Sequence, residues 1–213
     1  MLVPSMTDEE IRKEIEKDFP ILYRKSLYVA AEIKKQNMPL QKKRIIKTFD
    51  YVSKNKNNWI YKIDINKKIT VLVYLAYFYS DRGLTAIEVF NHSDVLLFFS
   101  AHFFKRYNER LHLNIVLPKD LLHKYIDDHV GYLFTTLEKV NDNLESVFGT
   151  TPTGVVLGTY HKDLQYVNVN TFITHDMLKG NQLENEKKLR EFSAKHLSKM
   201  NRADDLNNPP SSS

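Results

Sequence analysis

The sequence predicts an α+β protein in which an N-terminal helical segment packs on a mostly antiparallel sheet, with additional helices. Helix-start signals dominate the first 57 residues, and runs of β-branched and aromatic residues separated by turn sequences begin at residue 58. With 213 residues and 42% hydrophobic content, the chain can bury a sizeable core. We expect a helical segment over residues 1–57, an α+β domain over 58–200 and a disordered tail over 201–213.

The first third of the chain carries three helix-start signals. Thr7 and Glu10 have the spacing of a capping box, in which each side chain accepts a hydrogen bond from the other residue's backbone. Proline favours the first turn of a helix, and Pro20 and Pro39 each precede a stretch of helical periodicity. These signals predict helices over residues 7–19, 20–36 and 39–53.

The middle of the chain predicts an antiparallel meander followed by two helices. Residues 80–83 and 91–94 have turn composition and separate runs typical of strands. The expected strands cover residues 59–65, 70–80, 84–90 and 95–99. Ser100 is a good N-cap for a helix over residues 101–111, and Pro118 begins an amphipathic helix expected to reach residue 140.

The β pattern returns in the last third. We expect strands over residues 147–149, 153–160 and 165–174, then a helix over residues 183–200. The chain contains no cysteine, which excludes disulfides, thiolate metal sites and thiol nucleophiles. Its longest apolar stretches are well short of the ~20 residues that a spanning helix needs, and the N-terminus lacks an apolar signal region. A cytoplasmic protein that does not enter the membrane is therefore expected.

Positive charge is concentrated in residues 34–68, which carry eleven Lys and Arg against Asp50 and Asp64, whereas the rest of the chain is net negative. Such a block with interleaved aromatic residues can bind nucleic acid through phosphates and stacking. The candidate nucleic-acid-binding residues are Lys42, Lys43, Arg44 and Lys47, and the aromatic ones are Phe49, Tyr51, Trp59 and Tyr61. The block also fits the solvated side of helices whose aromatic residues lie in the core.

The helix after Ser100 carries the candidate catalytic residues. At ~100° per residue, one stripe holds His102, Arg106, Glu109 and Arg110, beside an apolar face. The first-turn N–H groups favour anions and a neutral imidazole at His102, so this residue suits a proton acceptor. Arginine can grip a phosphate with two hydrogen bonds. The same stripe also fits an ordinary solvated face with ion pairs at Glu109.

Polar side chains on the late strands form a second candidate group. Tyr160, Lys162 and Thr171 offer hydroxyl and ammonium groups that neighbouring strands can direct to one cleft, although turn and strand-edge polarity explains Lys162 as well. For a metal ion, His123 and Asp127 stand one helical turn apart, but helix periodicity directs His129 away from them. We therefore expect neither a metal site nor a cofactor.

The string His102-x-x-x-Arg106-x-x-Glu109-Arg110, followed by Gly154–Gly158 and Thr171–Thr174 on late strands, resembles BrnT-like and RelE-related toxin domains. These belong to a group of ribonucleases that cleave RNA without a metal ion. The resemblance implies that His102 accepts a proton, that Arg106 and Arg110 stabilise the phosphorane charge, and that Glu109 orients the arginines. It also implies RNA or another nucleic acid as a partner and, for a toxin, a neutralising protein.

The sequence thus leads to two functional hypotheses. The first is metal-independent cleavage of RNA phosphodiesters by the His102 stripe. The second is a noncatalytic module that binds nucleic acid or an acidic protein through the basic surface of residues 34–68. In the second hypothesis the His102 stripe is structural.

Overall fold

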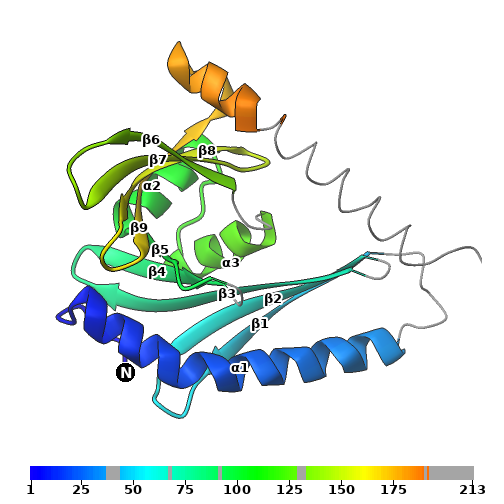
Figure 1. Ribbon diagram of the computed structural model, residues 1–213. Helices are drawn as coiled ribbons and strands as arrows, with labels where there is room; N and C mark the ends of the chain where they lie inside the picture. The colour runs from blue at the N-terminus through cyan, green and yellow to red at the C-terminus, as the bar shows by residue number, and fades with distance from the viewer. Residues whose placement is uncertain (37–43, 67–68, 91–92, 129–132, 190, 192–213) are drawn as a thin grey trace, which may run out of the picture.

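The computed structural model describes residues 1–36, 44–66, 69–90, 93–128, 133–189 and 191 (Figure 1). The helices are α1 (Asp8–Gln36), α2 (Ala101–Arg110), α3 (Pro118–Asp128), the short 3₁₀ helix η2 (His175–Met177) and a helix over residues 181–189. The strands are β1 (Ile45–Val52), β2 (Asn58–Asn66), β3 (Ile69–Ser80), β4 (Gly83–Val89), β5 (Leu96–Phe99), β6 (Leu133–Lys139), β7 (Leu144–Thr150), β8 (Gly154–His161) and β9 (Tyr166–Thr174). The α+β class is confirmed.

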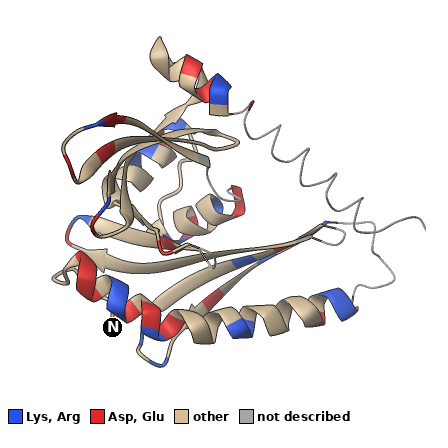
Figure 2. Ribbon diagram, viewed as in Figure 1, with Lys and Arg blue, Asp and Glu red and all other residues tan. Residues whose placement is uncertain are grey.

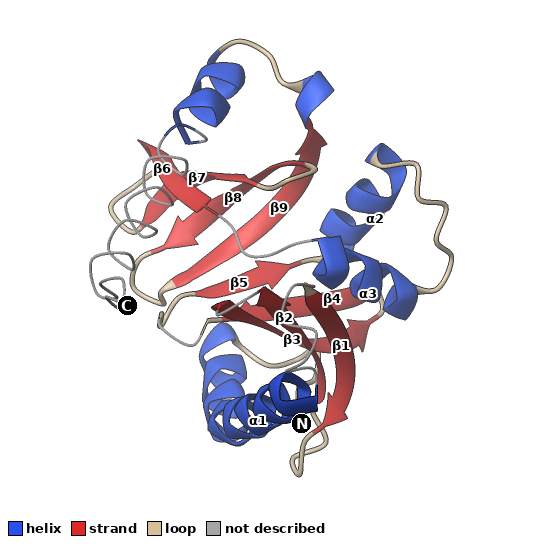
Figure 3. Cartoon of the chain, turned by 90° about the vertical axis from the view of Figure 1, so that its right-hand side faces the viewer, coloured by secondary structure: helices blue, strands red, loops and turns tan. Residues whose placement is uncertain are grey.

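All nine strands form one mixed sheet in the order β1-β2-β3-β4-β5-β9-β8-β7-β6. Two antiparallel meanders, β1–β5 and β6–β9, meet where β5 and β9 pair in parallel. The sheet curves around α2 and α3, which lie on its inner face, while α1 covers β1–β3 from the outer face (Figures 1 and 3). This arrangement puts α2 beside the junction of the two meanders.

Strand alternation divides the core between the two faces. On the inner face, Phe99 and Phe172 pack with Phe103 and Tyr107 of α2 and Tyr125 of α3. On the outer face, the buried side of α1 packs on Trp59, Tyr74 and other residues of β2–β4. A smaller outer cluster joins Leu189 to Phe148 and Val155, so helix 181–189 covers β7 and β8. Among the described helices, none is both long and apolar enough to cross a bilayer.

The predicted helices of the first third are corrected in two ways. One helix, α1, runs through Pro20, which is exposed and has no N–H to donate to the carbonyl four residues before it. Packing on the sheet, at residues such as Leu22 and Ile33, stabilises the part of the helix that follows Pro20. The predicted helix over residues 39–53 is wrong, because Ile45–Val52 form β1 and pair antiparallel with β2. The sheet therefore extends across the predicted boundary at residue 57.

The predicted helix over residues 118–140 is also too long. It ends at Asp128 among the described residues, and Leu133–Lys139 form β6. Phe134, Thr135 and Thr136 have high strand propensity, whereas the apolar residues Val130, Leu133, Phe134 and Leu137 have the spacing of a helix, so periodicity alone could not separate the two.

The other strands are confirmed with small shifts of boundary. The capping box is present: the backbone N–H of Thr7 donates to Glu10 Oε2 at 2.8 Å, and that of Glu10 donates to Thr7 Oγ1 at 3.3 Å. The hairpin after Ser80 turns at Gly83, whose φ of 113° suits glycine. For the last predicted helix, residues 181–189 are helical, whereas the tail over 201–213 and part of the turn over 91–94 lie outside the described residues.

Candidate active site at α2 and β9

Helix α2 begins where the sequence predicts. The Ser100 side chain accepts a hydrogen bond from the backbone N–H of Phe103 at 3.3 Å, and this cap places His102 in the first turn. Phe103, Phe104 and Tyr107 are buried against the inner face of the sheet. The opposite side of the helix is therefore left for the polar stripe, and His102 is exposed there.

The stripe contains one close ion pair. Arg106 Nη1 donates to Glu109 Oε2 at 3.1 Å, and both side chains are somewhat less than half exposed. Lys105 Nζ stands farther from the same carboxylate, at 4.0 Å. Glu109 thus orients Arg106 while leaving its guanidinium open to solvent. His102, Arg106 and Arg110 follow one another at intervals of four residues, which gives one row along the helix.

Arg110 connects α2 to β9. Its Nη1 donates to Thr171 Oγ1 at 3.2 Å and to the backbone carbonyl of Phe172. Strand β5 ends at Phe99, opposite Val169, so no strand of the described residues pairs with β9 beyond that point on this side. Arg110 satisfies a carbonyl at this open edge. The contact joins two candidate residues that are 61 positions apart in the sequence.

A β-bulge shapes β9 just before Thr171. Leu157 pairs with Thr171, whereas the next residue, Gly158, pairs with Val169, so Asn170 is an extra residue in the strand. The extra residue lets Val169 and Phe172 both enter the inner core. A Cβ atom at Gly158 would lie 2.3 Å from the Asn168 carbonyl oxygen, which explains the glycine at this position. The bulge leaves Asn170 exposed next to the Arg110 contact.

Two predicted supporting residues lie elsewhere. Tyr160 packs against the inner core and lines a largely apolar pocket with Leu97, Val147 and Val167. The Lys162 ammonium pairs with Glu145 Oε1 at 2.5 Å. Alternation along β8 directs Tyr160 and Lys162 to the face opposite His161 and Thr159. Only Thr171 of the late-strand group contacts the α2 row through a hydrogen bond among the described residues.

The basic block is distributed over several environments. Arg44 is held by Asp64, with Nε–Oδ1 and Nη2–Oδ2 distances of 2.9 and 2.5 Å. Lys47 is exposed on β1, and Lys42 and Lys43 lie outside the described residues. Trp59 and Tyr61 are buried under α1, so they cannot stack on a nucleic acid. Figure 2 shows that α1 is acidic in its first half and basic at its end.

Sequence reasoning missed a buried polar cluster on the inner face. Lys62 is fully buried and donates to the carbonyls of Ile126 and Asp127, which are at the C-terminal end of α3. Burial lowers the pKa of Lys62, an effect that the Asp64 and Asp127 carboxylates oppose. Glu88 on β4 is 2% exposed, and burial raises its pKa to about 8, while Lys62 works in the opposite direction. The sequence signal for this buried cluster was the presence of charged residues at inward-facing positions of the predicted strands.

The potential metal ligands have separate partners. His123 Nε2 lies 3.3 Å from Asp50 Oδ1, and Asp50 Oδ2 also pairs with Lys119 at 3.0 Å. Asp127 Oδ1 accepts a hydrogen bond from Thr48 at 2.5 Å. In the part of the chain that the structure describes, no three His, Asp or Glu side chains are grouped to hold a metal ion. His129 lies outside that part.

Comparison of the chain with protein-family models, curated proteins and solved structures found no match. The resemblance of the His102 element to ribonuclease toxin domains therefore stays a prediction from the sequence.

Proposed function

We propose that the protein binds RNA along α2 and the open edge of β9 and cleaves its backbone without a metal ion. The observation that carries this proposal is the hydrogen bond from Arg110 to Thr171. Because of it, the row of His102, Arg106 and Arg110 adjoins the half-buried hydroxyl of Thr171 and the exposed amide of Asn170 on β9. The row can contact successive phosphates, since arginine donates two hydrogen bonds to one phosphate.

The cleavage step follows from the groups present. His102 takes the proton of a ribose 2′-hydroxyl, and the 2′-oxygen attacks the adjacent phosphorus. The new P–O2′ bond forms as the P–O5′ bond breaks, and the 5′-oxygen takes up a proton from water. Arg106, oriented by Glu109, stabilises the negative charge that develops on the phosphoryl oxygens. The products are a 2′,3′-cyclic phosphate and a free 5′-hydroxyl.

A cleavage assay in excess EDTA tests this reaction. The purified protein should convert a labelled single-stranded RNA into fragments with cyclic phosphate ends. His102→Ala and Arg106→Ala should each lower the rate by ~10²-fold or more, because general base catalysis and charge stabilisation contribute about that much.

Lys105→Ala is the matched control, because Lys105 is on the same helix and 72% exposed. This variant should cleave like the parent protein. Circular dichroism should show all three variants folded. A His102→Ala variant with full activity, or a parent protein that cleaves no RNA, would contradict the proposal.

A second candidate function is noncatalytic binding of nucleic acid by the basic surface around the end of α1 and β1. Lys34, Lys35 and Lys47 are exposed there, and no acid of the described residues pairs with them. By contrast Lys13, Lys124 and Lys139 pair with Glu9, Asp128 and Asp142. Unpaired cations are free to replace counterions on a phosphate backbone, which favours this surface for binding.

Charge reversal separates this surface from an ordinary solvated one. The triple variant Lys34→Glu, Lys35→Glu and Lys47→Glu should bind RNA or DNA at least 10-fold more weakly and with a smaller salt dependence. Arg44 stays unchanged, because its loss would leave the buried Asp64 without a partner. The control triple of Lys13, Lys124 and Lys139 to Glu has the same net charge. Equal affinity of the two triples, measured by fluorescence anisotropy at several salt concentrations, would exclude a specific basic surface.

A further inference from the structure

The outer face of β8 and β9 carries a polar surface with no assigned role. Tyr166 points into the outer core beside α1, so alternation along β9 directs Asn168 to the same face. His161 is on this face too, because its ring stacks on that of Tyr166 with centroids 4.2 Å apart. Thr159, two residues before His161 on β8, completes the row. A typical sheet face is apolar where it is covered and polar where it meets water.

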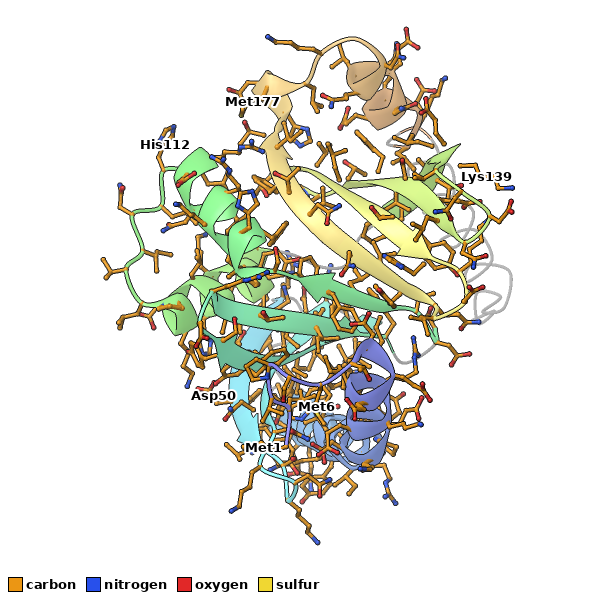
Figure 4. The ribbon with its side chains drawn as sticks, turned by 90° about the vertical axis from the view of Figure 1, so that its left-hand side faces the viewer. Met1, Met6, Asp50, His112, Lys139 and Met177 are labelled. Carbon is orange, nitrogen blue, oxygen red and sulfur yellow. The ribbon has the colours of Figure 1, made fainter. Side chains whose placement is uncertain are left out.

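The neighbouring helices border this surface, and Asp8 of α1 hydrogen-bonds the Tyr166 side chain at one end of it. Figure 4 views the β8–β9 part of the sheet with α1 below it, helix 181–189 above it and α2 beside β9. Thr159, His161 and Asn168 are half-buried, and Asn170 is exposed. The surface is therefore a partly exposed patch of imidazole, amide and hydroxyl groups.

Two contacts join the polar groups of this patch to one another, and Asn168 also hydrogen-bonds the Tyr166 side chain. Asn168 Nδ2 lies 3.4 Å from His161 Nε2, and Asn170 Nδ2 lies 3.4 Å from Thr159 Oγ1. Both contacts are at the long end of hydrogen-bond distances. A ligand can replace these two long hydrogen bonds at a small cost in free energy. Each amide then offers the ligand donor and acceptor groups.

Positive charge adjoins the patch on one side. Arg110 reaches Thr171, the residue after Asn170, and Arg106 precedes it by one helical turn. A ligand that crosses from β9 to α2 therefore meets hydrogen-bonding side chains first and guanidinium groups next. Single-stranded nucleic acid has this division, with unpaired base edges on one side and phosphates on the other.

We infer that the outer face of β8 and β9 binds the bases of single-stranded RNA whose phosphates lie on α2. The inference rests on the proposed RNA-binding function of α2 and adds the form of the substrate. Asn168 and Asn170 contact base edges through their amides, and the His161 ring, backed by Tyr166, offers a stacking surface. A duplex hides its base edges, so it gains only the phosphate contacts.

Binding measurements on two RNA forms test this inference. Fluorescence anisotropy compares a labelled 12-nucleotide single strand with the duplex of the same sequence, using His102→Ala protein to prevent cleavage. The single strand should bind at least 10-fold more tightly. The double variant Asn168→Ala/Asn170→Ala should lose ~10-fold for the single strand and nothing for the duplex, since contacts to unpaired bases are worth about that much.

Two further variants separate a direct contact from a structural effect. His161→Ala should weaken single-strand binding ~10-fold, whereas His161→Phe should restore it, because a phenyl ring keeps the stacking surface. Asn143→Ala, in the exposed turn between β6 and β7, is the matched control and should bind like the parent. Arg106→Ala should weaken both RNA forms alike.

The outcomes distinguish the inference from the function on which it rests. If Arg106→Ala weakens binding but the Asn168/Asn170 variant binds as the parent does, the phosphate site stands and the base surface is wrong. Equal affinity for the single strand and the duplex would likewise mean that the base surface is wrong. If the parent binds neither RNA, the proposed function fails and the inference fails with it.

Discussion

Replacing Phe103 with alanine should destabilise the protein by about 3 to 5 kcal/mol, the usual range for a buried phenylalanine. Phe103 is fully buried at the point where α2, α3 and the sheet meet. Its ring centroid lies 4.9 Å from that of Phe99, 5.6 Å from that of Tyr125 and 6.4 Å from that of Phe172. Alanine would leave a cavity among three rigid rings, which have little freedom to close it.

Urea unfolding followed by circular dichroism measures this loss. Phe103→Leu should recover more than half of the stability, because it keeps most of the apolar volume. Lys105→Ala, on the solvent side of the same helix, should change stability by less than about 0.5 kcal/mol. A loss below about 1 kcal/mol in Phe103→Ala would mean that α2 is not anchored by this residue.

The Phe103→Ala variant also tests whether packing in the core supports the candidate site. The same packing holds Arg110 against the open edge of β9. A variant that remains folded but has a loosened α2 should lose RNA cleavage more than it loses RNA binding, since the reaction needs a fixed geometry and phosphate contacts do not.

Helix α2 was predictable because its signals are local. The Ser100 cap and the apolar spacing of Phe103, Phe104 and Tyr107 are contained within eight residues, and both are confirmed. The strands β2–β5 were predictable for the same reason, since their alternation and the Ser80–Gly83 turn are visible in the sequence. Local patterns determine local structure well when no competing pattern is present.

The errors had different causes. Residues 45–52 contain strand-forming Ile, Thr, Phe, Tyr and Val residues and pair with β2 across the short turn of residues 53–57, so the predicted helix over 39–53 overlooked a local strand signal. Pro20 remains inside α1 because the sheet supports the helix on both sides of it. The contact between Arg110 and Thr171 depends on the parallel pairing of β5 and β9. From the sequence, the two residues could be proposed only as groups of suitable chemistry, because nothing in it shows that they meet.

The buried charges were missed for a related reason. Lys62 and Glu88 sit at inward positions of their strands next to apolar inward residues such as Ile60 and Ala86, and the buried Asp64 lies on the same side of β2 as Lys62. A charged residue within an alternating strand pattern is usually interpreted as the end of the strand. Here the charged residues continue the strand and are buried in the core. The end of α3 supplies the partner of Lys62, and that partner comes from residues more than sixty positions away.

Glu88→Gln should stabilise the protein by about 3 kcal/mol at pH 7 and by almost nothing at pH 4. Burial raises the pKa of Glu88 from 4.5 to about 8, although the charge of Lys62 acts in the opposite direction. The folded protein therefore holds a proton that the unfolded chain releases above pH 4.5. Stability from this group is fully present below about pH 4.5 and is lost as the pH rises through about 8. Glutamine keeps the size of the protonated acid but has no proton to lose.

Unfolding free energies measured from pH 4 to pH 9 check this expectation. The difference between Glu88→Gln and the parent should grow across that range and then level off above the folded pKa of about 8. Glu109→Gln is the matched control, because it makes the same chemical change on the solvent side of α2. A Lys62→Met variant gives an independent test, because Lys62 lowers the pKa of Glu88. Without Lys62, the difference in unfolding free energy that Glu88→Gln makes should continue to grow to a higher pH. A pH-independent difference for Glu88→Gln would show that Glu88 is ionised in the folded protein, and the inner face would then hold a paired charge instead of a neutral acid.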